Sequence, residues 1–420
     1  MQRSLVFFNR SLFSRRVPAR FCDLMLSTLP LACASGGCEN ALRNLTDPYE
    51  FGGLTHRGAT VAHVHDRQQG YGSGRTLELY AHLKRLGVNS IQLNTFAYQP
   101  RNESTTLRWD DPTLTFEDLA KEIRTARAQG LRVLVKPHVW VGGWTGDAAE
   151  LWRSKIRFAD DAPADAWFAS YAEFLLPQAR IAEREGASAF VVGTELVGLT
   201  HPRHSRRWRD LIAQVRNVYS GDLSYACEAW NAKNITFWDA LDAIGLDFYY
   251  GYPPPESPGL PPLEYVNVSA KPGQNPEQAA APRLAPNGVA DLAQFYRRKL
   301  DEHFAQARRL RRPLWLTEIG FPSHELAVRT PHAWPDPKLA VATELQAQGY
   351  RALLMAMRMN AANDADTTGA ANAPGYPQGM WIWKYATALD SYEGRNYKRG
   401  FHVRRKPAEA VVREIFQSAD

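Results

Sequence analysis

The feature that most constrains the fold is a regular alternation of short apolar segments with longer amphipathic stretches, beginning near residue 55. The apolar segments are rich in β-branched and aromatic residues and are predicted to be strands. They cover residues 58–64, 88–97, 131–141, 188–196, 222–229, 243–250, 313–321 and 379–386. Helical periodicity follows at 76–86, 116–128, 164–185, 206–219, 289–310, 339–360 and 407–416. Strand and helix alternating in this way predict an α/β fold, a (β/α)8 TIM barrel with loop insertions.

An open, doubly wound sheet is the competing architecture. That fold usually has a glycine-rich phosphate-binding loop directly after its first strand. The glycine-rich segment 70–74 (GYGSG) lies several residues past the first predicted strand and lacks the required spacing. We therefore interpret 70–74 as a loop and favour the barrel.

Composition and charge exclude some classes of protein. The chain has 420 residues, of which 45% are hydrophobic and 22% are charged, so it can bury a large core. We expect a single catalytic domain over residues 39–420. The net charge of +6 is concentrated near the N-terminus, where five arginines precede the first acidic residue, Asp23. Because the remainder is close to neutral, no nucleic-acid partner is predicted.

Residues 1–38 have the pattern of an export signal. An arginine-rich start precedes a short apolar stretch, 24–32, and then small residues with Cys33 and Cys38. We expect an exported protein that is periplasmic, secreted or lipoprotein-anchored, with membrane attachment only through an N-terminal lipid. Which of the two cysteines would carry the lipid stays open, and a disordered or misassigned start is the alternative. The four cysteines indicate neither a disulfide framework nor a zinc site.

Two irregular segments interrupt the alternation. Residues 251–287 are rich in proline and follow the sixth predicted strand, which would place them on the catalytic face of a barrel. They are interpreted either as one wall of a substrate cleft or as a surface insertion without a role. Residues 361–378 precede the eighth strand and are expected at the opposite face.

Two glutamates stand at the C-terminal ends of predicted strands. Glu195 ends the fourth and Glu318 ends the seventh, each after a threonine in an apolar run. Burying a carboxylate is costly, so such positions need a reason. In a retaining glycosidase two carboxyl groups about 5–5.5 Å apart act as acid/base and nucleophile. The alternative is that each glutamate forms a salt bridge at a strand end.

The chain resembles glycoside hydrolases of clan A, and most closely the family 113 type, whose described members are β-mannanases. The resemblance covers about residues 55–390. It is carried by segments 192–196 (VGTEL), 317–321 (TEIGF), 245–250 (GLDFYY), 70–73 (GYGS) and 381–383 (WIW). It implies that Glu195 is the acid/base and Glu318 the nucleophile. Many clan A enzymes have an asparagine before the acid/base that holds the sugar 2-hydroxyl; Thr194 stands there, so that contact is unassigned.

Other polar and aromatic residues near the predicted strand ends become candidates for substrate binding. Lys136, His138 and Trp140 alternate on one face of the third strand, and Lys136 would need a carboxylate partner there. Glu228 is a third carboxylate and the main rival for the acid role. Either Tyr249 or Tyr250 could hydrogen-bond the nucleophile, and depth decides whether Trp381 or Trp383 lies under the sugar. The full candidate set is Asn94, His138, Trp140, Glu228, Trp230, Tyr249, Tyr250, Trp381 and Trp383.

A metal-dependent hydrolase is the less favoured enzyme class. His63 and His65 form an H-x-H pair at the end of the first strand, as in amidohydrolase barrels. Such sites need more histidines on strands five and six and an aspartate on strand eight. Those strands have no histidine, and Asp390 lies beyond strand eight. We therefore expect no metal and no cofactor.

These observations lead to one hypothesis with two alternatives. We predict a monomeric, retaining glycoside hydrolase, endo- or exo-acting, that cleaves a β-linked polysaccharide or oligosaccharide. β-1,4-Mannan is the first substrate by family likeness alone, because no residue reads the C2 configuration of the sugar. The alternatives are a non-catalytic carbohydrate-binding barrel and the metal-dependent hydrolase.

Overall fold

The structure is a computed structural model that describes residues 54–142, 151–266, 282–368, 377–388 and 397–417. The predicted leader, residues 1–38, lies outside the described residues, as do Cys33 and Cys38. The fourth cysteine, Cys227, is buried and unpaired. No helix in the described ranges is long and apolar enough to cross a membrane.

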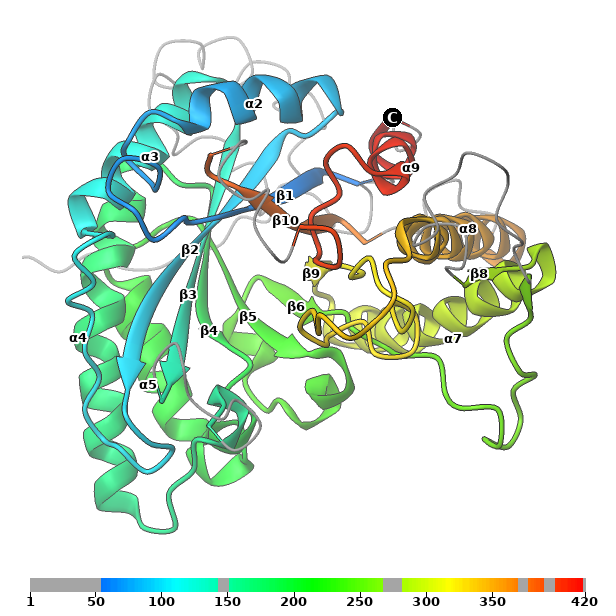
Figure 1. Cartoon of the computed structure of the whole chain (residues 1–420). Coiled ribbons are helices and arrows are strands. Elements are labelled where there is room, and N and C mark those ends of the chain that lie inside the picture. Colours follow the sequence, from blue (N-terminus) through cyan, green and yellow to red (C-terminus); the bar gives the residue numbers. More distant parts are fainter. Residues whose placement is uncertain (1–53, 143–150, 267–281, 369–376, 389–396, 418–420) are drawn as a thin grey trace, which may run out of the picture. The chain divides into compact units, whose positions relative to one another are not determined.

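Eight parallel strands close into a barrel, as the sequence predicts (Figure 1). Their order around the barrel is β1-β10-β9-β6-β5-β4-β3-β2, so each strand lies beside the strands that precede and follow it in the barrel sequence. The strands are β1 (His56–Ala62), β2 (Ser90–Gln99), β3 (Arg132–Val141), β4 (Ala189–Thr194), β5 (Asp222–Glu228), β6 (Ala243–Asp247), β9 (Leu314–Ile319) and β10 (Gly379–Ala386).

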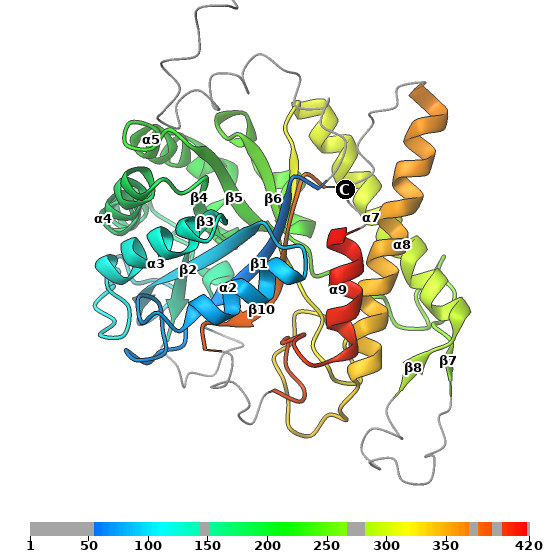
Figure 2. The ribbon, with the colours of Figure 1, turned by 90° about the horizontal axis from the view of Figure 1, so that it is seen from above.

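Helices surround the barrel on its outer side. They are α2 (Thr76–Arg85), α3 (Phe116–Ala128), α4 (Asp161–Glu185), α5 (Ser205–Arg216), α7 (Pro286–Leu310), α8 (Thr343–Thr368) and α9 (Pro407–Gln417). Figure 2 shows α7, α8 and α9 side by side. Between β5 and β6 the chain forms no α-helix but two 3₁₀ helices, η4 (Ala229–Asn234) and η5 (Trp238–Ala240), so the strict alternation is broken there.

The lower interior of the barrel is apolar. A buried cluster of small and aromatic side chains fills it, contributed by β3, β4, β5, β6, β9 and β10: Leu134, Ala189, Val191, Ala226, Ala243, Trp315 and Trp381. Side chains two residues apart on a strand point to the same face. Lys136 therefore lies one layer above Leu134, towards the C-terminal ends of the strands, where the interior becomes polar.

The two irregular segments are partly described. After β6, a two-stranded sheet forms from β7 (Tyr265–Val266) and β8 (Arg283–Leu284), and it packs against α7 and α8. The backbone N–H and C=O groups of Leu284 each form a 2.8 Å hydrogen bond with the side chain of Gln348 on α8. Helix α8 runs eight residues further than predicted and includes the first part of 361–378. Residues 267–281 and 369–376 lie outside the described residues.

Candidate active site

Three carboxylates lie side by side at the C-terminal ends of adjacent strands. In the β5–β6 pairing Glu228 is opposite Asp247, and in the β6–β9 pairing Asp247 is opposite Glu318. Glu195 follows β4, and its backbone N–H donates to the Ala226 carbonyl of β5 at 2.8 Å. All four acidic residues therefore belong to one rim of the barrel.

Glu318 is 5% exposed and is held by two donors. The Lys136 ammonium donates to its Oε1 atom at 2.7 Å, and the Tyr249 hydroxyl donates to its Oε2 atom at 3.1 Å. His138 Nε2 lies 3.8 Å from Oε1. These contacts fix the orientation of the Glu318 side chain. The hydrogen bond predicted from Tyr249 or Tyr250 is thus made by Tyr249.

Lys136 has the carboxylate partners that its buried position requires. Its ammonium also donates to Asp247 Oδ1 at 2.7 Å, and the Thr317 hydroxyl donates to the same oxygen at 2.8 Å. Burial opposes the charge on Lys136, but the two carboxylates outweigh it and raise the lysine pKa. Burial and the nearby charge of Glu318 raise the pKa of Asp247 well above its ordinary value. The group thus combines one ammonium with two carboxyl groups in a site closed to water.

Glu195 has a different environment from Glu318. It is 9% exposed. Its Oε2 atom accepts a hydrogen bond from Arg153 Nε at 3.0 Å and forms an ion pair with Arg153 Nη2 at the same distance. Its backbone is left-handed, with φ of 50°, a conformation that costs a non-glycine residue on the order of 1–3 kcal/mol. Backbone strain of this size persists only where the surroundings fix it, and it is concentrated at functional sites.

The segment around Glu195 shows how the chain holds that conformation. The next residue, Leu196, donates its N–H to the Tyr225 hydroxyl at 2.8 Å. Gly193 makes room for this tyrosine, since a Cβ atom there would stand 2.7 Å from the Trp208 ring and 2.8 Å from the Tyr225 ring. The glycine in the VGTEL segment therefore lets two aromatic rings pack beneath the turn that presents Glu195.

Glu228 is the carboxylate that could act as the acid in place of Glu195. Burial, and then the charge of Glu195, raise its pKa well above the ordinary value. Its Oε2 atom is buried and accepts no hydrogen bond from the described residues. The environment of Glu228, beside the candidate acid/base, therefore favours its protonated form.

The predicted pair on β2 and β3 is in contact. Asn94 Nδ2 lies 2.6 Å from His138 Nε2, and both side chains are buried. Burial, with the charges of Arg153 and Lys136, lowers the pKa of His138 well below its ordinary value, so the ring is neutral. A neutral imidazole beside an amide can offer a sugar both donors and acceptors.

The aromatic candidates divide by depth. Trp381 is fully buried in the apolar floor between Trp315 and His56, where a sugar in the mouth does not reach it. Trp383, two residues further along β10, is half-buried next to Gly320, and a cis peptide bond joins it to Lys384. Depth thus favours Trp383 as the platform.

The remaining aromatic candidates lie in different places. Trp140 is half-buried and meets Trp152 edge to face, with ring centroids 5.5 Å apart. Trp230 is 57% exposed, on η4 directly after β5. Tyr250 turns to the outer side and shares a 3.0 Å hydrogen bond with His303 of α7. Tyr250 therefore contacts a helix of the outer layer rather than Glu318.

The H-x-H pair has structural partners. His63 accepts a hydrogen bond from the Tyr71 N–H at 3.1 Å, and His65 pairs with Asp111 at 3.1 Å. No group of three His, Cys, Asp or Glu side chains in the described ranges could hold a metal ion. A hollow of about 540 Å³ opens beside this pair at the ends of β2 and β3, lined by Tyr98, Arg108 and Gly142 among others.

Several site residues were not among the sequence candidates. Asp247 carries a usable signal, because it is the lone charged residue in the apolar strand β6. Lys384 is buried beside Trp383 and Trp334, and burial lowers its pKa to about 8, partly offset by Glu318. Arg153 comes from η1 (Arg153–Lys155), after a long connection, and no local pattern marks it.

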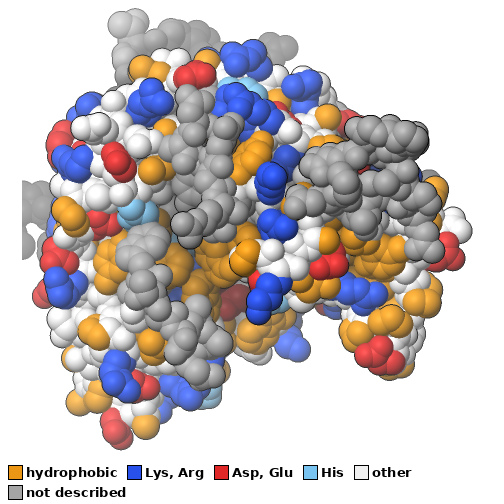
Figure 3. Space-filling model, in the orientation of Figure 1, with side chains coloured by type: hydrophobic (Ala, Val, Ile, Leu, Met, Phe, Trp, Pro, Cys, Tyr) orange, Lys and Arg blue, Asp and Glu red, His pale blue; other side chains and the backbone are white. Residues whose placement is uncertain are grey.

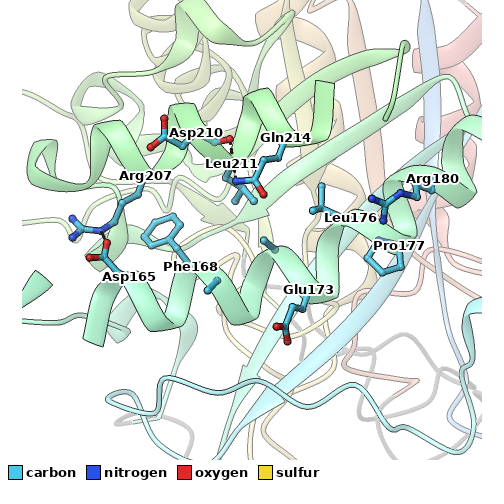
Figure 4. Close-up of a pocket in the computed structure, with 12 residues that line it drawn as sticks. Asp165, Phe168, Glu173, Leu176, Pro177, Arg180, Arg207, Asp210, Leu211 and Gln214 are labelled. Atoms are coloured by element: carbon cyan, nitrogen blue, oxygen red, sulfur yellow. Dashed lines mark hydrogen bonds and ion pairs between the residues drawn. The ribbon is translucent and has the colours of Figure 1, made fainter. Parts of the chain in front are cut away.

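A second hollow lies outside the barrel and away from this chemistry. It has a volume of about 600 Å³ between α4 and α5, where Arg207 binds Asp165 (Figure 4). Positive and negative side chains are interspersed on the face shown in Figure 3. The rim carboxylates, not the larger outer hollow, are the candidate active site.

A parallel eight-stranded barrel with paired carboxylates at its C-terminal rim defines a glycosidase-type enzyme. Comparison with known proteins agrees: the chain belongs to Glycoside Hydrolase Family 113, whose sequence profile matches residues 62–403. It is therefore a glycoside hydrolase. No curated protein matches the chain.

Solved structures give the same class. A GH113 β-1,4-mannanase is 25% identical with a TM-score of 0.64, over 87% of this chain and 99% of that one. A complex of a GH113 β-1,4-mannanase has the same identity and coverage, with a TM-score of 0.63. The fold also matches the GH113 β-mannanase of Alicyclobacillus acidocaldarius at 23% identity and a TM-score of 0.66, over 89% and 99% of the two chains.

Proposed function

We propose that the protein is a retaining glycoside hydrolase that cleaves β-1,4-mannan or manno-oligosaccharides, with Glu318 as nucleophile and Glu195 as acid/base. The main support is the contrast between the two glutamates. Glu318 is held through both of its oxygens, by the Lys136 ammonium and the Tyr249 hydroxyl, while Glu195 is held by Arg153 through Oε2 alone, which leaves its Oε1 atom to a leaving group. A nucleophile must be a carboxylate, and an acid must be able to take up a proton.

In the first step, Glu318 attacks the anomeric carbon and forms a glycosyl ester. The bond from that carbon to the glycosidic oxygen breaks, and Glu195 gives its proton to the departing oxygen. As the ester forms, the negative charge on Glu318 disappears, so the Lys136 ammonium is left to Asp247. The high pKa of Asp247 falls as its neighbour becomes neutral, which keeps the buried charge balanced.

In the second step, Glu195 acts as a base. It removes a proton from a water molecule, whose oxygen attacks the anomeric carbon and displaces Glu318 as a carboxylate. The product has the same anomeric configuration as the substrate, because two inversions have occurred. Tyr249 and Lys136 again stabilise the released charge.

Mannan is proposed from the related structures rather than from a contact. Two structures at 25% identity are described as β-1,4-mannanases. On this proposal Asn94 and His138 hold sugar hydroxyls, Trp383 is the platform, and Trp140 lies towards the leaving sugar. Export through the leader stays a prediction.

The experiment is a screen of the purified protein against β-mannan, manno-oligosaccharides, β-glucans and xylan. We expect the wild type to release sugars from the mannose substrates. Glu318→Gln should lose at least about 10³-fold in kcat, and Glu195→Gln about 10²–10⁴-fold. Glu228→Gln makes the same change in a neighbouring buried carboxyl and should lose less than either.

Azide separates the two acid candidates. In Glu195→Ala, azide should restore turnover of an activated aryl mannobioside and yield a β-glycosyl azide, because a small anion can enter where the base was. Rescue of Glu228→Ala instead would move the acid role to Glu228. Near-wild-type turnover by Glu318→Gln would contradict the proposed function.

A further inference from the structure

Arg153 binds Glu195 in an unusual manner for a strand-end carboxylate. It is only 6% exposed. Its Nε atom donates a hydrogen bond to Glu195 Oε2 at 3.0 Å, and its Nη2 atom lies 3.0 Å from the same oxygen in an ion pair. Neither of these contacts is made to Oε1. Because both nitrogens face Oε2, we expect a proton on Glu195 to sit on Oε1, the oxygen left to face a leaving group.

Two tryptophans fix the guanidinium. Its central carbon lies 4.2 Å from the ring centroid of Trp152 and 5.6 Å from that of Trp140. Cation–π contacts of this kind are attractive and are stronger when desolvated. Arg153 is thus held from one side by the rings and from the other by the Glu195 carboxylate, so its direction is set before a substrate arrives.

The third guanidinium nitrogen of Arg153, Nη1, indicates a binding position for a ligand. Arg153 Nη1 is buried and has no hydrogen-bond acceptor among the described residues. Buried donors in native proteins are almost always paired, and a charged one is costly to leave unpaired. An unpaired N–H beside the candidate acid and next to Trp140 suits the hydroxyl oxygen of a sugar on the leaving-group side.

We propose that Arg153 is a positioning residue that fixes which oxygen of Glu195 carries the proton, and that its Nη1 donates to the departing sugar. The inference rests on the proposed function and deepens it. Without Arg153, the proton on Glu195 would be less well aimed at the leaving oxygen, which must be protonated in the first step.

The test uses aryl β-mannobiosides whose leaving groups range from dinitrophenol, which needs no acid, to unsubstituted phenol, which does. We expect Arg153→Met to lower kcat/KM about 10²-fold for the phenol and less than about 3-fold for dinitrophenol. Arg153→Lys, which keeps the charge but not the planar guanidinium, should recover only part of the phenol activity.

Arg207→Met is the matched control. Arg207 is another shielded arginine bound to carboxylates, Asp165 and Asp161, but on the outer helices (Figure 4). It should leave kcat/KM for both substrates unchanged. Thermal unfolding of all variants shows which of them are folded. If Arg153→Met is not folded, the comparison of Arg153→Lys with the wild type replaces it.

The outcomes are distinguishable. An equal fall in kcat/KM for both leaving groups would mean that Arg153 is only structural and would overturn the inference. A wild type that hydrolyses none of the mannobiosides would overturn the proposed function, and the inference with it.

Discussion

At the scale of single residues, the two candidate catalytic glutamates differ in their cationic partners. Glu318 shares the lysine Lys136 with Asp247 inside the barrel, whereas Glu195 is held by the arginine Arg153 from a connecting segment. A lysine ammonium is a compact charge, and an arginine fork sets direction. The difference matches a nucleophile that must stay charged and an acid that must aim a proton.

Replacing Lys136 with methionine tests the buried charge group. Two carboxyl groups would then face each other without a cation, so we expect stability to fall by about 3–5 kcal/mol. The rate should fall at least about 10²-fold, since Glu318 would share a proton with Asp247. Urea unfolding and kcat/KM on manno-oligosaccharides measure the two effects.

The double variant Lys136→Met/Asp247→Asn is the control. Removing one carboxylate together with the cation leaves a single charge, so much of the lost stability should return. If the free energy of unfolding of Lys136→Met alone were within about 1 kcal/mol of the wild-type value, the cluster of Lys136, Asp247 and Glu318 would have no structural importance.

Sequence reasoning located strand-end residues better than residues on connections. The positions of Glu195 and Glu318 were predictable because each ends an apolar strand, whereas the choice between Tyr249 and Tyr250 stayed open. Arg153 was not predictable, because it lies on η1, outside the barrel strands, and its contact with Glu195 depends on how the connection between β3 and α4 folds. The left-handed backbone of Glu195 was equally hidden, since a glutamate does not prefer it.

At the scale of elements, helix boundaries follow capping chemistry. Helix α3 begins where Thr115 and Asp118 cap each other, the side chain of each accepting from the backbone of the other. The sequence predicted both ends of α3 because Thr115 is a good N-cap and Gly130 follows the end. The predicted helical ranges include none between the strands at 222–229 and 243–250, and two short 3₁₀ helices connect β5 and β6 there.

Thr115→Ala should therefore destabilise the protein without changing its chemistry. Losing an N-cap costs about 1 kcal/mol, and α3 lies on the outer layer. We expect a lower urea midpoint with kcat/KM unchanged. Thr125→Ala, in the same helix and half-buried, removes a threonine that caps nothing and should be neutral or slightly stabilising. Equal losses from both variants would contradict the capping account.

At the scale of the whole molecule, buried histidines link stability to pH. Burial lowers the pKa of His303 to about 4, and that of His63 to about 4. Between pH 4 and 6.5 the folded protein then binds fewer protons than the unfolded chain, so stability is present above pH 6.5 and is lost as the pH falls towards 4. Each histidine contributes up to about 3 kcal/mol to this loss.

His303→Gln removes one such group while keeping a hydrogen-bonding side chain near Tyr250. We expect its urea midpoint to fall less than that of the wild type between pH 6.5 and 4.5. His332→Gln, at an exposed histidine, is the comparison and should follow the wild type. Parallel plots of urea midpoint against pH for all three proteins would show that burial of His303 does not contribute to the pH dependence of stability.

The most direct test of the central claim is to trap the covalent intermediate. A 2-deoxy-2-fluoro-β-mannobiosyl fluoride reacts with the nucleophile of a retaining β-mannanase, and the fluorine at C2 slows the hydrolysis of the ester that forms. We predict that the labelled protein gains one mannobiosyl group, and that peptide mapping by mass spectrometry places it on Glu318. A label on Glu195 or Glu228, or mannan hydrolysis with inverted configuration, would contradict the account.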